Sequence, residues 1–186
     1  MVIFNLILFL KVMGIRKYIL QDWHANLVNP TKGKYIIVLF RIAQLIIKRK
    51  FTKVIFFWYL LFYRITVEWF MCVELSWKTS IGPNFQLWHG TGLVIHPNTI
   101  IGANCSVRQC TTIGVKQDID GAYSGLAPKI GNHVDIGCNT VIIGNITIDD
   151  HVSIGAGSVV VKSISNNSVV VGNPARVIKK VETESF

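Results

Sequence analysis

The sequence predicts a mainly β protein, a parallel β-helix preceded by a helical N-terminal region. Aliphatic residues recur every six positions from Ile130 to Ile164. A basic, aromatic-rich third precedes the repeat, and one long segment without aliphatic anchors interrupts it. A period of six fits neither an amphipathic helix nor an alternating strand. Fixed hexapeptide periods are typical of stacked β-helices, so we expect a solenoid.

Each six-residue unit is expected to form one short strand and one corner. The aliphatic anchor points inward and stacks on its equivalents in the turns above and below. A neighbouring Gly, Asn or Asp takes the corner conformation at low steric cost. Three such sides close one turn of about 18 residues. The anchors of the C-terminal block are Ile130, Ile136, Ile142, Ile148, Ile154 and Val160.

The period extends towards the N-terminus with one irregularity. The first anchors are Leu75, Ile81 and Leu87; after a slip of two residues the period resumes at Ile95, Ile101, Val107 and Ile113. Residues 115–129 contain Gly, Pro and charges but no anchor, so we expect a loop that leaves one corner. Cys105 occupies an inward position and is expected to be a buried thiol rather than half of a disulfide.

These patterns divide the chain into three parts. Residues 1–73 form a helical, basic region with helices expected at 35–50 and 53–71. Residues 74–164 form the β-helix domain with its loop at 115–129, and residues 165–186 form a C-terminal closing segment. The net charge of +9 belongs to the first part, because residues 1–70 hold 11 Lys and Arg against Asp22 and Glu68, and 11 − 2 = +9.

A basic, apolar region indicates anionic partners or a membrane surface, or a helical cap whose charges are solvated. No nucleic acid is expected, since no recognised motif accompanies the charge. The apolar runs at 1–10 and 54–63 are too short to cross a bilayer, and no secretory signal pattern is present. We therefore expect a cytoplasmic protein, with peripheral contact at the inner membrane left open.

His89 is the first candidate for catalysis. It lies two residues beyond the anchor Leu87 in Trp-His-Gly-Thr-Gly, hence near a corner, and imidazole suits general-base work near neutral pH. Glu74 precedes it by 15 residues, which brings both near the same edge of the prism on adjacent turns. A carboxylate there could orient the ring. The alternative is a corner histidine and a surface glutamate without any relation.

The other histidines and the cysteines give weaker signals. His133 and His151 are 18 residues apart and are expected to stack outside the solenoid as a surface ladder; they lack a third metal ligand, so no metal is expected. His96 follows an anchor at a corner and is a weaker base candidate, as is His24. Cys110 has no evident base partner, which argues against a covalent thiol mechanism.

Four features together resemble the hexapeptide-repeat acetyltransferases, above all serine O-acetyltransferases and the similar colanic-acid and capsule-type acetyltransferases. They are the hexapeptide blocks, the Trp-His-Gly-Thr-Gly segment, the loop before Pro128-Lys129-Ile130, and the ending Val-Gly-Asn-Pro-Ala-Arg. The resemblance covers residues 20–180. It implies a left-handed β-helix, a homotrimer with active sites between neighbouring prisms, and acetyl-CoA as co-substrate in the groove between two subunits.

The resemblance also implies roles for particular residues. His89 matches the catalytic histidine, and Glu74 the carboxylate that supports it, which is an Asp in serine acetyltransferases. Asp22 matches an acidic residue on the acceptor side. Residues matched to acetyl-CoA binding are Gly114 and Val115 at the thioester and Cys138 and Ala156 at the pantetheine arm. The cations expected to meet the nucleotide phosphates are Arg176, Lys179 or Lys162.

Two departures from serine acetyltransferases concern the acceptor. Those enzymes have an Asp before the catalytic histidine and an Arg-His pair before Pro-Lys-Ile; this chain has Trp88 and Leu126-Ala127 there. Serine is a zwitterion, and burying its charges without partners is costly. Trp88 offers a flat apolar face that suits a sugar ring, so a glycan hydroxyl is the favoured acceptor. The alternatives are a serine acetyltransferase, which Asp22 favours, and a non-catalytic solenoid that serves as a binding module.

Overall fold

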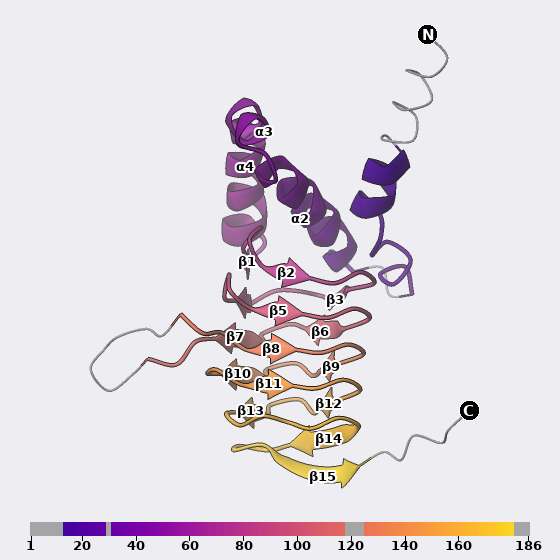
Figure 1. Cartoon of the computed structure of the whole chain (residues 1–186), viewed down its shortest axis with the longest axis vertical. Helices are drawn as coiled ribbons and strands as arrows, with labels where there is room; N and C mark the ends of the chain where they lie inside the picture. Colours follow the sequence, from indigo (N-terminus) through magenta and orange to yellow (C-terminus); the bar gives the residue numbers. More distant parts are fainter. Residues whose placement is uncertain (1–12, 29–30, 118–124, 181–186) are drawn as a thin grey trace.

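A computed structural model describes residues 13–28, 31–117 and 125–180. The protein is a parallel β-solenoid with helices at one end and a closing hairpin at the other (Figure 1). The expected parallel β-helix with an N-terminal helical region is confirmed. Three sheets, which we name A, B and C, form the sides of the prism and contain five, four and six strands.

The strands are short because each side of the prism is short. Sheet A contains β1 (Val73–Leu75), β4 (Leu93–Ile95), β7 (Thr112–Gly114), β10 (Val141–Ile143) and β13 (Val159–Val160). Sheet B contains β2 (Ser80–Ile81), β5 (Ile100–Ile101), β8 (Lys129–Ile130) and β11 (Thr147–Ile148). Sheet C contains β3 (Gln86–Trp88), β6 (Ser106–Arg108), β9 (Asp135–Ile136), β12 (Ser153–Ile154), β14 (Ser168–Val171) and β15 (Arg176–Lys180). The solenoid thus continues beyond Ile164, since β14 pairs with β12 before β15 returns antiparallel.

The hexapeptide anchors form the core in three inward columns, one for each sheet. The column of sheet A is at most 2% exposed and consists of Leu75, Ile95, Ile113, Ile142 and Val160. Cys105 lies inside as predicted, 1% exposed, and burial raises the pKa of its thiol. Stacked aliphatic columns remove apolar surface from water in every turn, which is the main stabilising term for a solenoid.

Strand register explains each irregularity of the repeat. Val73 pairs with Leu93, so the first turn contains 20 residues, whereas Val141 pairs with Val159 and that turn contains 18. The two-residue slip seen in the sequence is therefore confirmed as one longer turn. Ile101 pairs with Ile130 across 29 positions, and the additional 29 − 18 = 11 residues belong to the segment between β7 and β8.

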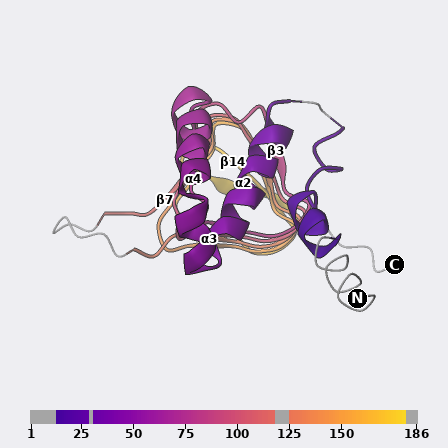
Figure 2. The same ribbon diagram turned by 90° about the horizontal axis from the view of Figure 1, so that it is seen from above.

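The N-terminal region covers the first turn of the solenoid with helices. Residues 13–19 are helical, and α2 (Gly33–Ile47), α3 (Lys50–Ile55), α4 (Phe57–Tyr63) and the π-helical η1 (Arg64–Phe70) follow. Seen from above, α2, α3 and α4 lie across the end of the prism (Figure 2). The single helix expected over 53–71 is interrupted at Phe56, whose φ of −99° and ψ of 27° are not helical. Among the described helices, none is both long and apolar enough for a membrane span.

A buried ion pair joins this helical cap to the prism. The Arg41 guanidinium on α2 donates to both carboxylate oxygens of Asp22, at 2.7 and 3.2 Å, and both side chains are at most 2% exposed. Arg41 also donates to the carbonyl oxygens of Ile81 and Gly82, at 2.8 and 2.7 Å. Asp22 in turn accepts the N–H of Phe85 at 2.8 Å. The pair therefore satisfies backbone groups at the open edge of the first turn.

Removing the Asp22 carboxylate is expected to destabilise the protein strongly. Asp22→Ala leaves the Arg41 guanidinium buried without its counter-ion, a change that costs about 3–5 kcal/mol in comparable sites. Glu68→Ala, which removes a carboxylate from the more exposed Arg64–Glu68 pair, is the matched control and should cost less than about 1 kcal/mol. Thermal melting at one fixed protein concentration measures both. Equal melting temperatures for the two variants would contradict the structural role of Asp22.

Candidate active site

The corner between sheets C and A in the first turn is wider than those below it. The anchors Leu87 and Ile95 are eight positions apart, whereas Val107 and Ile113 in the next turn are six apart (95 − 87 = 8; 113 − 107 = 6). The two additional residues thus lie in the turn that contains His89. Gly90 and Gly92 both have positive φ there, at 82° and 70°. The longer turn pushes this corner outward from the prism.

His89 stands at the outer point of this corner with an exposed side chain. Its φ is +61°, and the N–H of Gly90 donates to the carbonyl oxygen of Trp88 at 2.7 Å, which closes a tight turn around it. The N–H of His89 donates to the Thr31 hydroxyl at 3.3 Å. A Cβ on Gly33 would collide with the Leu87 carbonyl, so the start of α2 packs directly against β3. The cap therefore fixes the position of this corner.

Glu74 lies on the other side of the same corner. It is the outward residue of β1, pairs in register with Val94, and is exposed. The N–H of Gly92 donates to the carbonyl oxygen of Cys72 at 2.8 Å, so the β1 and β4 ends of the corner stack on one another. Within the described chain, neither the Glu74 carboxylate nor the His89 imidazole has a hydrogen bond or ion-pair partner. Both groups are available to a substrate.

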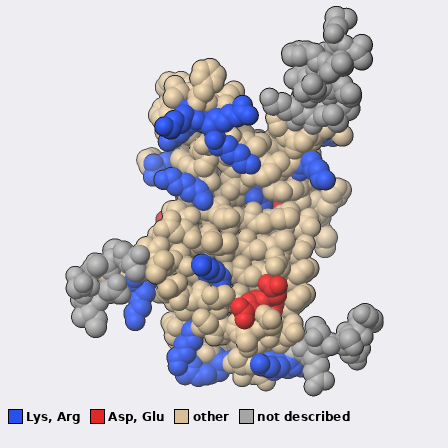
Figure 3. Space-filling view, viewed as in Figure 1, with Lys and Arg blue, Asp and Glu red and all other residues tan. Residues whose placement is uncertain are grey.

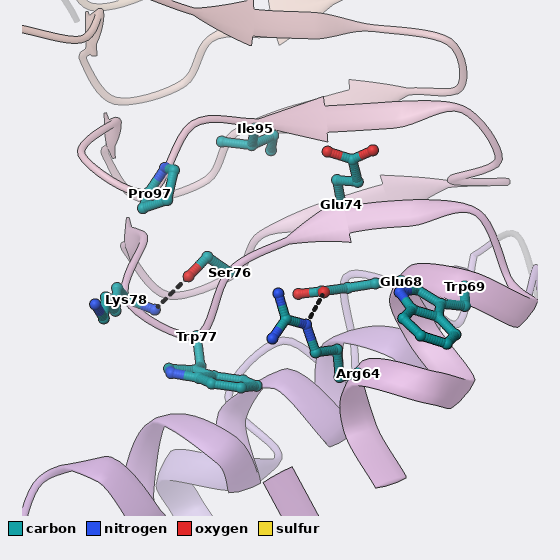
Figure 4. Close-up of a pocket in the computed structure, with 9 residues that line it drawn as sticks. All are labelled: Arg64, Glu68, Trp69, Glu74, Ser76, Trp77, Lys78, Ile95 and Pro97. Atoms are coloured by element: carbon teal, nitrogen blue, oxygen red, sulfur yellow. Dashed lines mark hydrogen bonds and ion pairs between the residues drawn. The ribbon is translucent and has the colours of Figure 1, made fainter. Parts of the chain in front are cut away.

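A cleft of about 540 Å³ opens beside Glu74, between η1 and the outer face of the first turns (Figure 4). Its lining residues are Arg64, Glu68, Trp69, Glu74, Ser76, Trp77, Lys78, Ile95 and Pro97. Two indole rings and two carboxylates border the same space, a combination that suits hydroxyl-rich rings, because indoles pack on apolar ring faces and carboxylates accept from hydroxyls. Apart from Glu74, sequence reasoning missed these residues, because η1 and β1–β4 meet only in three dimensions.

A second groove, of about 500 Å³, runs along sheet A near the segment between β7 and β8. It is lined by Lys116, Leu126, Val141, Ile143, Gly144, Asn145, Ile146, Val159 and Val161. Gly114 pairs with Ile143 on this face, and a Cβ added at Gly114 would meet nothing within 4 Å. The backbone of β7 is therefore open to close approach by a ligand. The groove is mostly apolar with one cation, Lys116, which the sequence did not single out.

The remaining acetyl-CoA positions lie along the same side of the prism or at its far end. Cys138 and Ala156 stand at the corner between sheets C and A, where the N–H of Gly157 donates to the Cys138 carbonyl at 2.8 Å. This corner is the continuation of the one that contains His89. Val115 directly follows β7. Lys162 lies exposed after β13, and Arg176 and Lys179 are exposed on β15.

Two residues predicted for the acceptor have partners inside the chain. Asp22 is 2% exposed, and both of its carboxylate oxygens accept hydrogen bonds from Arg41 or Phe85, so its side chain does not face the cleft surface. Trp88 is half-buried on the outer face of β3, where the Arg108 guanidinium lies 5.6 Å from its ring centroid. Arg108 stands directly opposite Trp88 in the neighbouring strand.

None of the other histidines lines the cleft beside Glu74, although His96 lies between two residues that do, Ile95 and Pro97. His133 and His151 stack with ring centroids 4.7 Å apart and an interplanar angle of 5°, which confirms the predicted ladder. The Nδ1 atom of His96 accepts the N–H of Asn98 at 3.2 Å and so stabilises its own corner. No three His, Cys, Asp or Glu side chains gather as a metal site in the described ranges.

The β-solenoid, with its capped first turn and two outer grooves, can be compared with proteins of known class. No family model matches the chain. It is 38% identical over 118 residues to the putative colanic acid biosynthesis acetyltransferase WcaB of Escherichia coli (strain K12), which covers 63% of this chain and 70% of WcaB. It is 43% identical over 107 residues to the chloroplastic serine acetyltransferase 1 of Arabidopsis thaliana, 57% of this chain and 33% of that protein.

Solved structures show the same architecture. The soybean serine acetyltransferase apoenzyme superposes with a TM-score of 0.73 at 28% identity, over 88% of this chain and 69% of that one. A serine acetyltransferase in complex with CoA has a TM-score of 0.65 at 25% identity, over 79% and 57%. The chain therefore belongs to the hexapeptide-repeat acetyltransferases and is an acetyl-CoA-dependent acyltransferase.

Proposed function

We propose that the protein transfers the acetyl group of acetyl-CoA directly to a sugar hydroxyl of a surface polysaccharide or of its precursor. His89 takes the proton from the acceptor hydroxyl as that oxygen attacks the thioester carbonyl. Glu74 orients the imidazole and stabilises the imidazolium that forms. The thiolate of CoA leaves and recovers the proton from His89. His89 fits this role because its ring is exposed and makes no hydrogen bond within the described part of the chain, which leaves it free to contact Glu74 and the acceptor hydroxyl.

Acetyl-CoA binding is proposed along the outer face of sheet A. The apolar groove beside β10 and β13 suits the pantetheine arm, and the open backbone at Gly114 suits the thioester. Backbone N–H groups near Gly114 and Val115 stabilise the oxyanion, each worth about 3 kcal/mol. Cys138 and Ala156 border the arm from the neighbouring corner. The nucleotide phosphates are proposed to bind cations of this chain. Lys116 lines the groove, and Lys162, Arg176 and Lys179 lie nearer the C-terminal end of the solenoid.

The aromatic cleft beside Glu74 is the main observation in favour of a glycan acceptor. Trp69 and Trp77 present indole faces to the same space as Glu68 and Glu74. Relatedness to WcaB, whose name assigns it to colanic acid biosynthesis, points the same way. Trp88 adds a third aromatic ring next to His89, stacked under Arg108. Asp22 supports this site from within, through Arg41 and the first turn, rather than by contact with the acceptor.

Serine is the second candidate acceptor, because the similar solved structures are serine acetyltransferases. A zwitterion needs one free cation and one free carboxylate in the site. In the cleft, the Arg64 Nε atom lies 3.1 Å from a Glu68 carboxylate oxygen, so these two charges compensate each other. Lys78 also lines the cleft and is, among the described residues, a free cation for a carboxylate, but the other carboxylate, Glu74, is assigned to His89 in this mechanism, which leaves no carboxylate for the serine ammonium group. Leu126 and Ala127 carry no charge. The glycan acceptor therefore fits the described side chains better.

A homotrimer is proposed as the active assembly. Outward positions on an exposed strand are normally polar, yet those of sheet A include Val94, Val141, Ile143 and Val159. The outward positions of β3, β6, β9 and β12 in sheet C are polar or aromatic, as at Gln86 and Arg108. An apolar outer face on one side of the prism supports contact with a neighbouring subunit along that side.

The first prediction concerns the general base. His89→Ala should lower kcat for acetyl-CoA-dependent thiol release by about 10²–10⁴-fold, because the acceptor proton loses its base. His133→Ala is the matched control, because His133 is an exposed histidine with a φ of 55°, close to that of His89, and has no proposed role; it should keep nearly full activity. Light scattering should give the same oligomer for both. Full activity of His89→Ala would refute the mechanism.

A second prediction concerns the open backbone at β7. Gly114→Ala adds a methyl group where the thioester is proposed to lie, and it meets no protein atom within 4 Å. The melting temperature should stay unchanged while KM for acetyl-CoA rises about 10-fold or more. Steady-state kinetics at saturating acceptor measure this. An unchanged KM would place the thioester elsewhere.

The acceptor itself is tested by a thiol-release assay with oligosaccharides, nucleotide sugars and free serine. The glycan proposal predicts saturable turnover with a sugar acceptor, and a loss of that turnover when Trp69 and Trp77 are changed to Ala. Saturable turnover of serine alone would establish the second candidate instead. No thiol release with any acceptor would favour a non-catalytic binding module.

A further inference from the structure

The outer side of α3, α4 and η1 is apolar although the solenoid lies on their other side. On α4 and η1 the residues that face the protein are Leu60, Tyr63 and Val67, each at most 4% exposed. The opposite stripe follows the spacing of one helical face. It consists of Val54, Trp58, Leu61, Phe62, Ile65 and Trp69, with exposures from 37% to 77%. We call this stripe, together with the cations described next, the cap surface.

A helix that is hydrophobic all round is buried on all sides in its working state. Here the described chain covers only one side, and contiguous exposed apolar surface of this kind marks an interaction site. The side chains of Trp58 and Trp69 are 76% and 74% exposed. Tryptophan is enriched at protein interfaces and at membrane–water interfaces, where the apolar ring is buried and the N–H group reaches water. The cap surface therefore has no partner among the residues that the structure describes.

Positive charge borders this apolar stripe. Lys48, Arg49, Lys50 and Lys53 are exposed where α2 ends and α3 begins, and Figure 3 shows Lys and Arg atoms grouped at this end of the molecule as well as at the opposite end. Between residues 33 and 70 the sequence has a single carboxylate, Glu68, which is paired with Arg64. None of these four cations forms an ion pair within the described part of the chain.

This charge distribution decides between the candidate partners. In a two-fold contact the same surface meets its own copy, so a patch of four unbalanced cations would face another such patch. Like charges brought together without counter-ions are destabilising. An anionic bilayer surface supplies the missing counter-charge and accepts Trp and Phe at the level of its headgroups. Charge and composition both fit a lipid surface.

We propose that the cap surface docks the enzyme on a bilayer that contains anionic lipids. The docked face adjoins the candidate active site, because Trp69 and Arg64 belong to η1 and also line the acceptor cleft. Glu74 and His89 come from the first turn, the one nearest the helices. On the proposed function, the acceptor sugar is then carried on a membrane lipid and reaches the cleft from the bilayer side.

Vesicle co-sedimentation of the full chain tests the docking itself. Vesicles of equal parts phosphatidylcholine and phosphatidylglycerol should bind the protein at low salt, and binding should weaken as salt is raised because the attraction is screened. Pure phosphatidylcholine vesicles should bind far less. Absence of binding to the anionic vesicles at low salt, or equal binding to both compositions, would overturn the proposal.

Two variants and one matched control assign the binding to the cap surface. Lys50→Glu/Lys53→Glu should weaken binding at least about 30-fold, from two lost cations alone, and Trp58→Ser should weaken it by removing a ring that inserts. Lys129→Glu/Lys180→Glu makes the same change of charge on β8 and β15, away from the helices, and should bind like the unaltered protein. Equal loss in the control would show nonspecific attraction and overturn the proposal. Circular dichroism melting checks that each variant is folded.

Two further measurements distinguish membrane docking from self-association of the cap surface and from failure of the proposed function. If Trp58→Ser breaks a larger assembly seen by light scattering while vesicle binding is unchanged, the cap surface binds a second copy and the lipid proposal fails. Thiol release with soluble sugars, measured without vesicles, tests the proposed function alone. Transfer without vesicle binding would refute the docking only, and vesicle binding without transfer to any acceptor would refute the function only.

Discussion

The buried contact between Arg41 and Asp22 is the interaction on which the site depends. A solenoid ends in an edge whose backbone groups lack a further turn, and such an edge invites pairing with other chains. Here one guanidinium and one carboxylate satisfy Ile81, Gly82 and Phe85 at that edge. Desolvating two charges is costly, and it is offset only because nearly every donor and acceptor of the pair has a partner. The first turn, which contains His89 and Glu74, is held in place by this cap.

The architecture below the cap could be predicted because the repeat is a direct consequence of geometry. One inward residue per side of a triangular prism gives a period of six, and this period is visible without any knowledge of contacts between distant residues. Even the longer first turn was visible, as a slip of two residues after Leu87. Handedness was not, because a periodic pattern is the same for both hands; it followed from the family resemblance alone.

The site could be predicted only in part, and the reason is physical. Corner positions follow from the repeat, so His89 could be placed at a corner from the sequence. The Trp69–Trp77 cleft could not, because it joins a helix to strands whose contact has no periodic signal. Asp22 illustrates the same limit: the family resemblance matched it to an acidic residue on the acceptor side, whereas its partner Arg41, 19 residues away, is recognisable only once α2 lies across the prism. The break at Phe56 likewise reflects packing rather than helix propensity.

The division of charge gives the cap and the solenoid different tasks. The solenoid is electrically balanced, with 8 basic and 8 acidic side chains in residues 71–186, while the cap carries the whole net charge of +9. A small free acceptor such as serine would diffuse to the cleft from any side and would gain nothing from a charged, aromatic cap beside it. An acceptor held at a lipid surface gains local concentration when the enzyme is held at the same surface. Trp69 belongs to both the cap surface and the cleft. The proposed docking of the cap surface would therefore also place the cleft beside the bilayer, where a lipid-linked acceptor would lie.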